Sequence, residues 1–225
     1  MKTIIYIDGY NLFYGCLKHS QDKWLDLKSL FADKIVYEQN PHAEVTSIKF
    51  FTADIKAKVA SNGQSAQLAQ QSYHRALEQL YPTEIQIIKG FYSLEKARLL
   101  AFQQPPDKTQ RVDVWRLEEK QTDVNIALEA YRDVAKARAE QVIFVSNDTD
   151  LSPALQALRE DYGSDLTIGV VIPVRASSNH RPGNQQLSVF ADWTRKHIRD
   201  EELSESHLPL QIATKKKPIK KPEYW

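Results

Sequence analysis

Short apolar runs alternate with segments of helical periodicity along most of this chain, and that alternation limits the folds open to it. The first run, Ile4 to Ile7, ends directly at Asp8-Gly9, as expected of a buried parallel strand. The predicted strands are 4–7, 44–52, 84–92, 142–145 and 166–172, and the predicted helices are 24–36, 64–81, 123–139, 153–161 and 187–198. Strands separated by such helices imply right-handed crossovers, so the sequence predicts an α/β fold with a mostly parallel central sheet.

Other segments are interpreted from composition and periodicity. Residues 93–110 contain Pro105-Pro106 and are predicted to form a surface excursion, followed by a short extended segment over 112–119. The helix at 123–139 is predicted to have a wet face that includes Asp133 and to bury an apolar stripe of Val124, Ala127, Leu128, Tyr131 and Ala135. After Arg199 the chain turns polar and then basic. We therefore expect one domain over 1–199 and a disordered tail over 200–225.

Composition excludes several classes of protein. The 225 residues are 42% hydrophobic and 26% charged, as in an ordinary globular domain, and the net charge of +1 gives no overall attraction to nucleic acid. Cys16 is the single cysteine, so no disulfide within the chain and no thiolate zinc site can form. The apolar run at the N-terminus is too short for a signal peptide, and no run approaches the roughly 20 residues that span a bilayer. We expect a cytoplasmic protein without membrane contacts.

Aspartates follow two of the predicted strands, where parallel sheets keep their binding sites. Asp8 ends the first strand, and Asp148 and Asp150 follow the strand at 142–145. Asp123 opens the helix before that strand. If the two strands are neighbours, these carboxylates converge at one edge of the sheet.

Convergence of this kind requires either protonation or a bound cation. Two carboxylates about 4 Å apart repel by roughly 4 kcal/mol at an effective dielectric constant near 20. With no histidine or cysteine nearby, hard oxygen ligands favour Mg²⁺ or Mn²⁺, which suits hydrolysis of a phosphodiester. Taken singly, each aspartate is better interpreted as a helix cap or turn residue. Asp8 fits that interpretation least, because it closes a strongly apolar strand and Gly9 permits close approach of a ligand.

Three short motifs around these aspartates resemble the signatures of the NYN domain family, a PIN-like nuclease family. The resemblance covers about residues 2 to 199 and suggests an uncharacterised bacterial branch. The motifs are Asp8-Gly9-Tyr10-Asn11-Leu12, Glu119-Lys120-Gln121-Thr122-Asp123-Val124-Asn125 and Ser146-Asn147-Asp148-Thr149-Asp150-Leu151. The resemblance implies a three-layer PIN-like, Rossmann-like fold and a Mg²⁺- or Mn²⁺-dependent endoribonuclease that binds and hydrolyses RNA, or a non-catalytic relative.

The family's pattern also implies roles for individual residues. The catalytic set would be Asp8, Asn11, Asp123, Asp148 and Asp150, with the four aspartates as metal ligands. The chain departs from the commonest pattern at Asn147 and Leu151, where many relatives have glycine and phenylalanine. Glu129 lies six residues beyond Asp123, on a different face of an ideal helix, and is placed outside the cluster. The segment 180–184 is interpreted as a plain surface loop, with an RNA contact as the alternative.

Two functional hypotheses remain open from sequence. The first is a metal-dependent RNA-cleaving enzyme, and the second is an RNA-binding or regulatory protein that keeps the pocket without turnover. A haloacid-dehalogenase-like phosphatase needs a second aspartate where this chain has Tyr10, and no P-loop motif is present. The five lysines between Lys215 and Lys221 either solubilise a tail or contact RNA phosphates. The RNA target, the metal count and the oligomeric state are not determined by sequence.

Overall fold

The computed structural model describes residues 1–177 and 185–225 and confirms an α/β fold around a mostly parallel sheet. Within these residues the main sheet has seven strands in the order β4-β3-β2-β1-β5-β6-β7. Only the β3–β4 pair is antiparallel. The strands are β1 Lys2–Asp8, β2 Glu44–Ala53, β3 Ile85–Leu100, β4 Arg111–Lys120, β5 Gln141–Val145, β6 Thr167–Val171 and β7 Trp193–Arg195.

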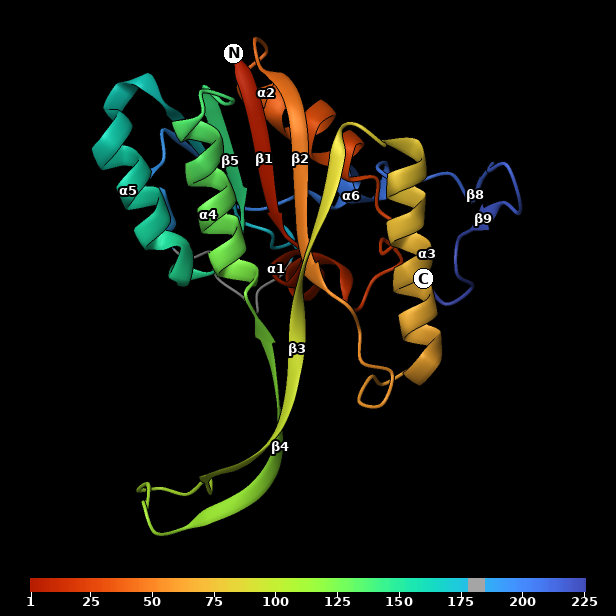
Figure 1. Ribbon diagram of the computed structural model, residues 1–225, viewed down its shortest axis with the longest axis vertical. Coiled ribbons are helices and arrows are strands. Elements are labelled where there is room, and N and C mark those ends of the chain that lie inside the picture. The colour runs from red at the N-terminus through yellow and green to blue at the C-terminus, as the bar shows by residue number, and fades with distance from the viewer. Residues whose placement is uncertain (178–184) are drawn as a thin grey trace.

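Helices cover both faces of the sheet, which gives three layers (Figure 1). The α-helices are α1 Gly9–Leu12, α2 Tyr37–Gln39, α3 Gly63–Leu80, α4 Thr122–Ala135, α5 Ser152–Tyr162 and α6 Asp200–Ser204. Phe13–Leu17 and Lys28–Val36 are π-helical, and Thr149–Leu151, Gly163–Asp165 and Leu187–Phe190 are 3₁₀ turns. Ile5 and Ile7 of β1 belong to the core beneath α3 and the Lys28–Val36 helix, whereas Ile4 and Tyr6 belong to the core beneath α4 and α5.

Strand β1 lies at the centre of the sheet and has the site at its end. It pairs in parallel with β2 on one side and with β5 on the other. Strands β2 and β3 lie on one side of β1. The later crossover connection, which contains α4, leads to β5 on the other side of β1. This change of direction opens a crevice at the carboxyl ends of β1 and β5. The expectation that these two strands are neighbours is confirmed.

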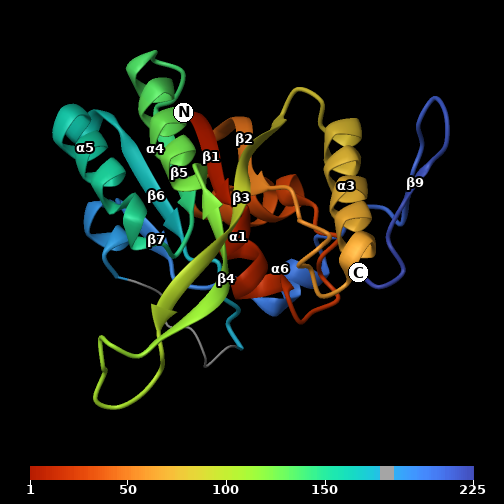
Figure 2. The same cartoon turned by 60° about the horizontal axis from the view of Figure 1, so that its bottom comes forward.

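The prediction of an irregular excursion over 93–110 is wrong. Strands β3 and β4 pair from Phe91 opposite Lys120 to Leu100 opposite Arg111. They form a long hairpin that projects from the rest of the molecule (Figures 1 and 2). Only the connection at about 101–110, with its prolines, is irregular. Mixed polar and apolar residues suit a ribbon with solvent on both faces, which has no buried face to produce a clear pattern.

The prediction of a helix over 187–198 is also wrong. After the 3₁₀ turn the chain extends into β7, which pairs with β6. The carboxylate of Asp192 accepts a hydrogen bond from the backbone N–H of Ile168 at 2.7 Å and pairs with Arg159. These long-range contacts dock the segment on the edge of the sheet, where an extended backbone replaces the helix that the apolar spacing suggests.

The segment after Arg199 is ordered, in contrast to the predicted tail. It contains α6 and a small hairpin of β8 Gln211–Ile212 and β9 Ile219–Lys220. Its scattered apolar side chains are buried in the core, namely Leu203, Leu208, Ile212 and Ile219. The indole N–H of Trp24 donates to the carbonyl of Pro209 at 2.9 Å. Composition predicted disorder because it averages over the whole segment. A few buried apolar side chains at suitable spacing are nevertheless enough to pack the segment against the domain.

Helix α4 buries a different face from the one that its apolar stripe predicts. Ile126, Ala130 and Val134 face the core, while Val124 and Leu128 are exposed. Asp133, predicted on the wet face, is buried and accepts hydrogen bonds from Tyr6 Oη at 2.9 Å and Lys49 Nζ at 2.5 Å. A buried lysine on the neighbouring strand thus turns a charged residue inward, and periodicity within the helix carries no sign of it.

Buried His74 on α3 is expected to make the fold sensitive to acid. The side chain packs beside Phe50 and Tyr73, and burial lowers its pKa from 6.5 to about 4, with the Lys89 charge acting in the same direction. Below the unfolded pKa the unfolded chain takes up a proton that the folded chain does not, so stability falls as the pH drops from 6.5 towards 4. At about pH 4.5 the loss relative to pH 7 is about 2 kcal/mol.

Urea unfolding of the native protein and His74→Leu at both pH values measures this effect. The variant is expected to lose less stability on acidification than the native protein by that amount. Parallel pH dependence of the two proteins would show that His74 does not stay neutral in the fold.

Candidate functional site

A pocket of about 330 Å³ lies at the carboxyl ends of β1 and β5, as the convergence of strand ends predicts. Its walls come from the start of α1, the end of β4, the start of α4 and the turn after β5. The lining residues are Asp8, Tyr10, Asn11, Glu118, Glu119, Lys120, Thr122, Asp123 and Asp148. Five of the nine carry carboxylates, and Lys120 is the one basic residue among them. We call this cavity the acidic pocket.

Asp8 is the most deeply buried acid of the pocket, with 2% of its surface exposed. Its carboxylate accepts hydrogen bonds from the backbone N–H of Asn11 at 2.9 Å, from Asn11 Nδ2 at 2.6 Å and from Ser146 Oγ at 2.9 Å. Asp8 is therefore also the N-cap of α1, so the cap and the acidic cluster are compatible. Burial raises the pKa of Asp8, while these hydrogen bonds act in the opposite direction.

Gly9 serves packing rather than ligand approach. A Cβ at this position would lie 2.6 Å from the carbonyl oxygen of Phe51 on β2. The glycine lets the chain turn from β1 into α1 against the neighbouring strand, and so aims Asp8 at the crevice.

Ser146 joins the two strand ends that form the pocket. Its hydroxyl donates to Asp8 and accepts a hydrogen bond from the backbone N–H of Asp148 at 3.0 Å. Asp148 in turn caps the following 3₁₀ turn, since its carboxylate accepts from the backbone N–H of Asp150 at 3.0 Å. The buried serine thereby couples the orientation of Asp8 to the turn that presents Asp148.

Asp123 completes the wall contributed by α4. It is half-buried in the first turn of the helix, whose cap position belongs to Gln121 with a φ of 74°. Burial and then the charges of Asp8, Asp148, Glu119 and Asp150 raise its pKa to about 6. The raised pKa reflects the repulsion expected among converging carboxylates. The start of α4 can lie this close to β3 because Gly90 has no side chain. A Cβ at Gly90 would lie 2.7 Å from Thr122 Oγ1.

Two other residues of the sequence motifs, Asp150 and Lys120, and Glu129 beyond them occupy less central places. Asp150 is exposed and does not line the pocket, although its charge contributes to the raised pKa of Asp123. Lys120 lines the pocket and forms an ion pair with Glu118. Glu129 lies outside the pocket and accepts a hydrogen bond from Lys49 Nζ at 2.6 Å, which agrees with its exclusion from the cluster. The segment 180–184, predicted to be a surface loop, lies outside the described residues.

Sequence reasoning missed the contribution of the hairpin to the pocket. Glu118 and Glu119 lie near the end of β4, and Glu119 is paired across the ribbon with Tyr92 of β3. Burial and the charge of Asp8 raise the pKa of Glu119, whose carboxylate also accepts a hydrogen bond from Thr122 Oγ1 at 2.5 Å. Both glutamates stand just before Asp123 in the chain, so recognition of β4 as a strand leading directly into that helix would have identified them.

The donor set of the pocket fits a hard divalent cation better than zinc. Carboxylate oxygens dominate the lining, and neither histidine nor cysteine is among it. Within residues 1–177 and 185–225, no group of three or more histidine, cysteine, aspartate or glutamate side chains is arranged to hold a metal ion. Mg²⁺ sites, however, commonly use one or two carboxylates and complete their coordination with water and substrate phosphate.

The family model of the NYN domain matches residues 2–181, which include all three acidic motifs. The chain belongs to the NYN domain family. NYN domains are part of the PIN-like superfamily, in agreement with the α/β architecture and with an acidic crevice beside β1. Membership of the NYN family suggests a nuclease-type function. In the part of the chain that the structure describes, no helix is long and apolar enough to cross a membrane.

Two other proteins are similar to this NYN chain. The 6-hydroxy-3-succinoylpyridine 3-monooxygenase HspA of Pseudomonas putida (strain DSM 28022 / S16) is 40% identical over 241 residues, covering 100% of this chain and 75% of the relative. A crystal structure of a protein of unknown function from Vibrio parahaemolyticus RIMD 2210633 superposes with a TM-score of 0.50. That structure is 20% identical, with 89% of this chain and 94% of the other covered, so it supports the fold alone.

Proposed function

We propose that this protein is a divalent-metal-dependent endoribonuclease that hydrolyses RNA phosphodiesters in the acidic pocket. The observation that carries the proposal is the convergence of Asp8, Asp123 and Asp148 at the switch point between β1 and β5. Family membership adds to it, since NYN nucleases act on RNA. Repulsion among these carboxylates destabilises the metal-free site, and a cation would relieve it.

Of Asp8, Asp123 and Asp148, one or two would hold Mg²⁺ or Mn²⁺ directly, and the remaining carboxylates, with exposed Asp150, would act through bound water. The bound ion would activate a water molecule and neutralise charge on the phosphate. Asn11 and Ser146 keep the Asp8 carboxylate in one orientation, because each donates a hydrogen bond to Asp8 Oδ2. Ligands held in place by such partners lose less conformational freedom on binding.

Near the mouth of the pocket, the chain offers contacts for the RNA itself. Tyr10 and Lys120 line the pocket, and Tyr10 is 40% exposed. A base can stack on an exposed aromatic ring, and an ammonium group can approach a phosphate oxygen. In the hydrolysis, the water oxygen forms a bond to phosphorus while the ester oxygen leaves and takes up a proton.

A second candidate follows from the relative that is named a monooxygenase. At 40% identity over the whole chain, the two proteins are similar enough to make oxygenation of a hydroxypyridine a candidate activity. The lining of the acidic pocket favours hydrolysis instead. It lacks the histidines that, with one carboxylate, form the usual non-haem iron site of oxygenases.

A paired assay separates these activities. The purified chain is incubated with single-stranded and structured RNAs in Mn²⁺, Mg²⁺ or chelator, and separately with 6-hydroxy-3-succinoylpyridine, oxygen and reduced nicotinamide and flavin cofactors. We expect RNA fragments only where a divalent metal is present, and no oxygenated pyridine product. Oxygenation of the pyridine without RNA cleavage would replace the nuclease proposal. Metal-independent binding of RNA without cleavage of a broad panel would favour the non-catalytic alternative.

A further inference from the structure

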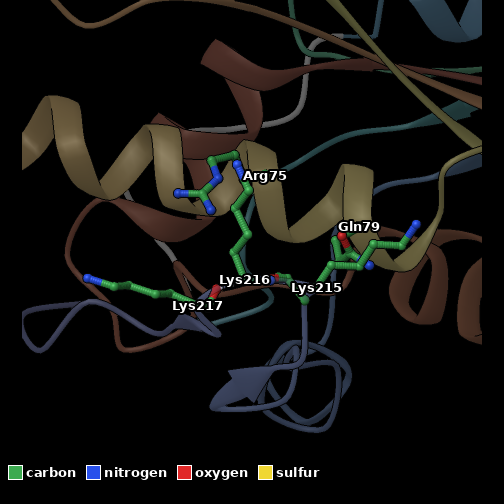
Figure 3. A pocket seen from close by; sticks show the side chains of 6 residues that line it. Arg75, Gln79, Lys215, Lys216 and Lys217 are labelled. Carbon is green, nitrogen blue, oxygen red and sulfur yellow. Dashed lines mark hydrogen bonds between the residues drawn. The ribbon is translucent and has the colours of Figure 1, made fainter.

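A second cavity, of about 630 Å³, lies between α3 and the loop that joins β8 to β9 (Figure 3). Its lining consists of Arg75, Gln79, Thr214, Lys215, Lys216 and Lys217. We call it the basic pocket. Four of its six residues are cationic, and Gln79 adds an amide that can form hydrogen bonds. No acidic residue is among them.

The charges of the basic pocket are not neutralised by the protein. Among the described residues, none of the four cations takes part in a salt bridge; the described ion pairs of arginine involve other residues. The whole chain has a net charge of only +1, so these positive charges are concentrated locally. Like charges held together repel, and a bound anion would stabilise the arrangement.

The loop between β8 and β9, which contains Thr214, Lys215, Lys216 and Lys217 and is called the lysine loop below, has a defined conformation held by hydrogen bonds. Thr214 Oγ1 donates to the carbonyl of Lys217 at 2.8 Å and accepts from the backbone N–H of Lys216 at 3.1 Å, which closes the turn. On either side of the loop, Ile212 and Ile219 are paired across the small sheet and buried in the core.

The C-terminus fastens the same hairpin to α3. Tyr224 Oη donates to the carbonyl of Ser65 on α3 at 2.8 Å. The Trp225 ring lies against Trp24 and Tyr73. A tail that merely improves solubility would not need these anchors, so the structure favours the RNA-contact interpretation of the lysine run.

We propose that the basic pocket binds the phosphate backbone of single-stranded RNA and anchors the strand that the acidic pocket cleaves; this rests on the proposed function. In Figure 3 the Lys215 and Lys217 side chains point away from each other along α3 instead of converging on one point. Charges spread in this way suit consecutive phosphates of an extended polyanion better than one small anion. Lysines bind phosphates as point charges, so the anchoring is independent of base sequence.

Binding of a fluorescein-labelled, unstructured RNA in chelator tests the anchor, since no cleavage is expected there. The triple variant Lys215→Gln, Lys216→Gln and Lys217→Gln is expected to weaken affinity about tenfold or more. The slope of log affinity against log salt should fall by about 2, as expected for three single-strand phosphate contacts. Arg75→Gln, on the opposite wall, should weaken binding in the same direction.

A matched control changes the net charge equally at three exposed lysines elsewhere. In Lys108→Gln, Lys136→Gln and Lys196→Gln, affinity should fall by less than about twofold. Equal losses in the two triple variants would overturn the anchor, because bulk charge would then explain them. If the lysine-loop variant lost binding to phosphatidylserine vesicles but kept RNA affinity, the pocket would bind a lipid surface and the proposal would also fail.

Failure of the anchor can be distinguished from failure of the nuclease function. If the anchor alone fails, the lysine-loop variant cleaves long RNA as efficiently as the native protein. If the nuclease function alone fails, the native protein cleaves nothing but RNA binding still depends on Lys215, Lys216 and Lys217. If both hold, the variant should cleave a dinucleotide normally, since this substrate is too short to reach both pockets, and should cleave long RNA with a raised KM.

Discussion

Asp8→Asn is expected to reduce the rate of metal-dependent RNA cleavage by at least about 100-fold, because loss of residues that only support metal ligands already costs 10- to 100-fold. Asparagine keeps the shape of the side chain and can still accept the Asn11 N–H bond, but it removes the negative charge that would hold the cation. Since burial raises the pKa of Asp8, its charge is unfavourable in the metal-free fold. Metal-free Asp8→Asn should therefore be at least as stable as the native protein. Single-turnover cleavage and urea unfolding measure the two effects.

Asp113→Asn provides the control for this substitution. Asp113 is an exposed carboxylate on the hairpin, paired with exposed Lys96 at 3.2 Å. Its replacement should leave the cleavage rate within about twofold of the native rate. Cleavage by Asp8→Asn at the native rate would place the chemistry elsewhere or identify the activity as a contaminant. A destabilised Asp8→Asn would show that the cap role of this residue outweighs the cost of its burial.

Lys49→Ala is expected to destabilise the fold by about 3 kcal/mol, as removal of one partner from a buried ion pair leaves the other charge without compensation. The Lys49 side chain is 7% exposed, and its Nζ lies 2.6 Å from Glu129 Oε2 and 2.5 Å from Asp133 Oδ2. Without the ammonium group, the partners left to the buried Asp133 carboxylate among the described residues are the Tyr6 hydroxyl and Arg138, the latter at 3.3 Å. Urea unfolding followed by tryptophan fluorescence measures the loss.

Lys89→Ala is the matched control, because the lysine is on the next strand and also pairs with an aspartate. Both members of its pair with Asp54 are about half exposed, so the expected loss is below about 1 kcal/mol. A loss for Lys49→Ala no larger than that of the control would mean that water reaches the Asp133 carboxylate in the variant. The difference in burial between Lys49 and Lys89 would then have no effect on the free energy of unfolding.

Much of the acidic pocket was predictable because its residues follow strands. Asp8 directly follows the apolar run of β1, and Asp148 comes three residues after the end of β5; the carboxyl ends of parallel strands meet at one edge. Asn11 is near enough in sequence for its bond to Asp8 to be a local feature. Glu119 was not identified, because its place depends on β4 pairing with β3 to carry it to the edge of the pocket. Asp150 was grouped with the pocket residues because position in the sequence does not reveal on which side of a turn a side chain emerges.

The sequence by itself determined the alternation of strands and helices and the acids at the strand ends, because burial of a strand and turning of a chain leave local periodic signals. Tertiary structure alone decided which face of α4 is buried, where the segment after Arg199 packs, and how the lysine loop lies against Arg75. Each of these depends on a partner far away in the chain, such as Lys49 for Asp133 or Trp24 for the C-terminal segment. Local periodicity indicates whether a residue is buried or exposed. It does not indicate which distant residue packs against it, because that contact forms only when the whole chain folds.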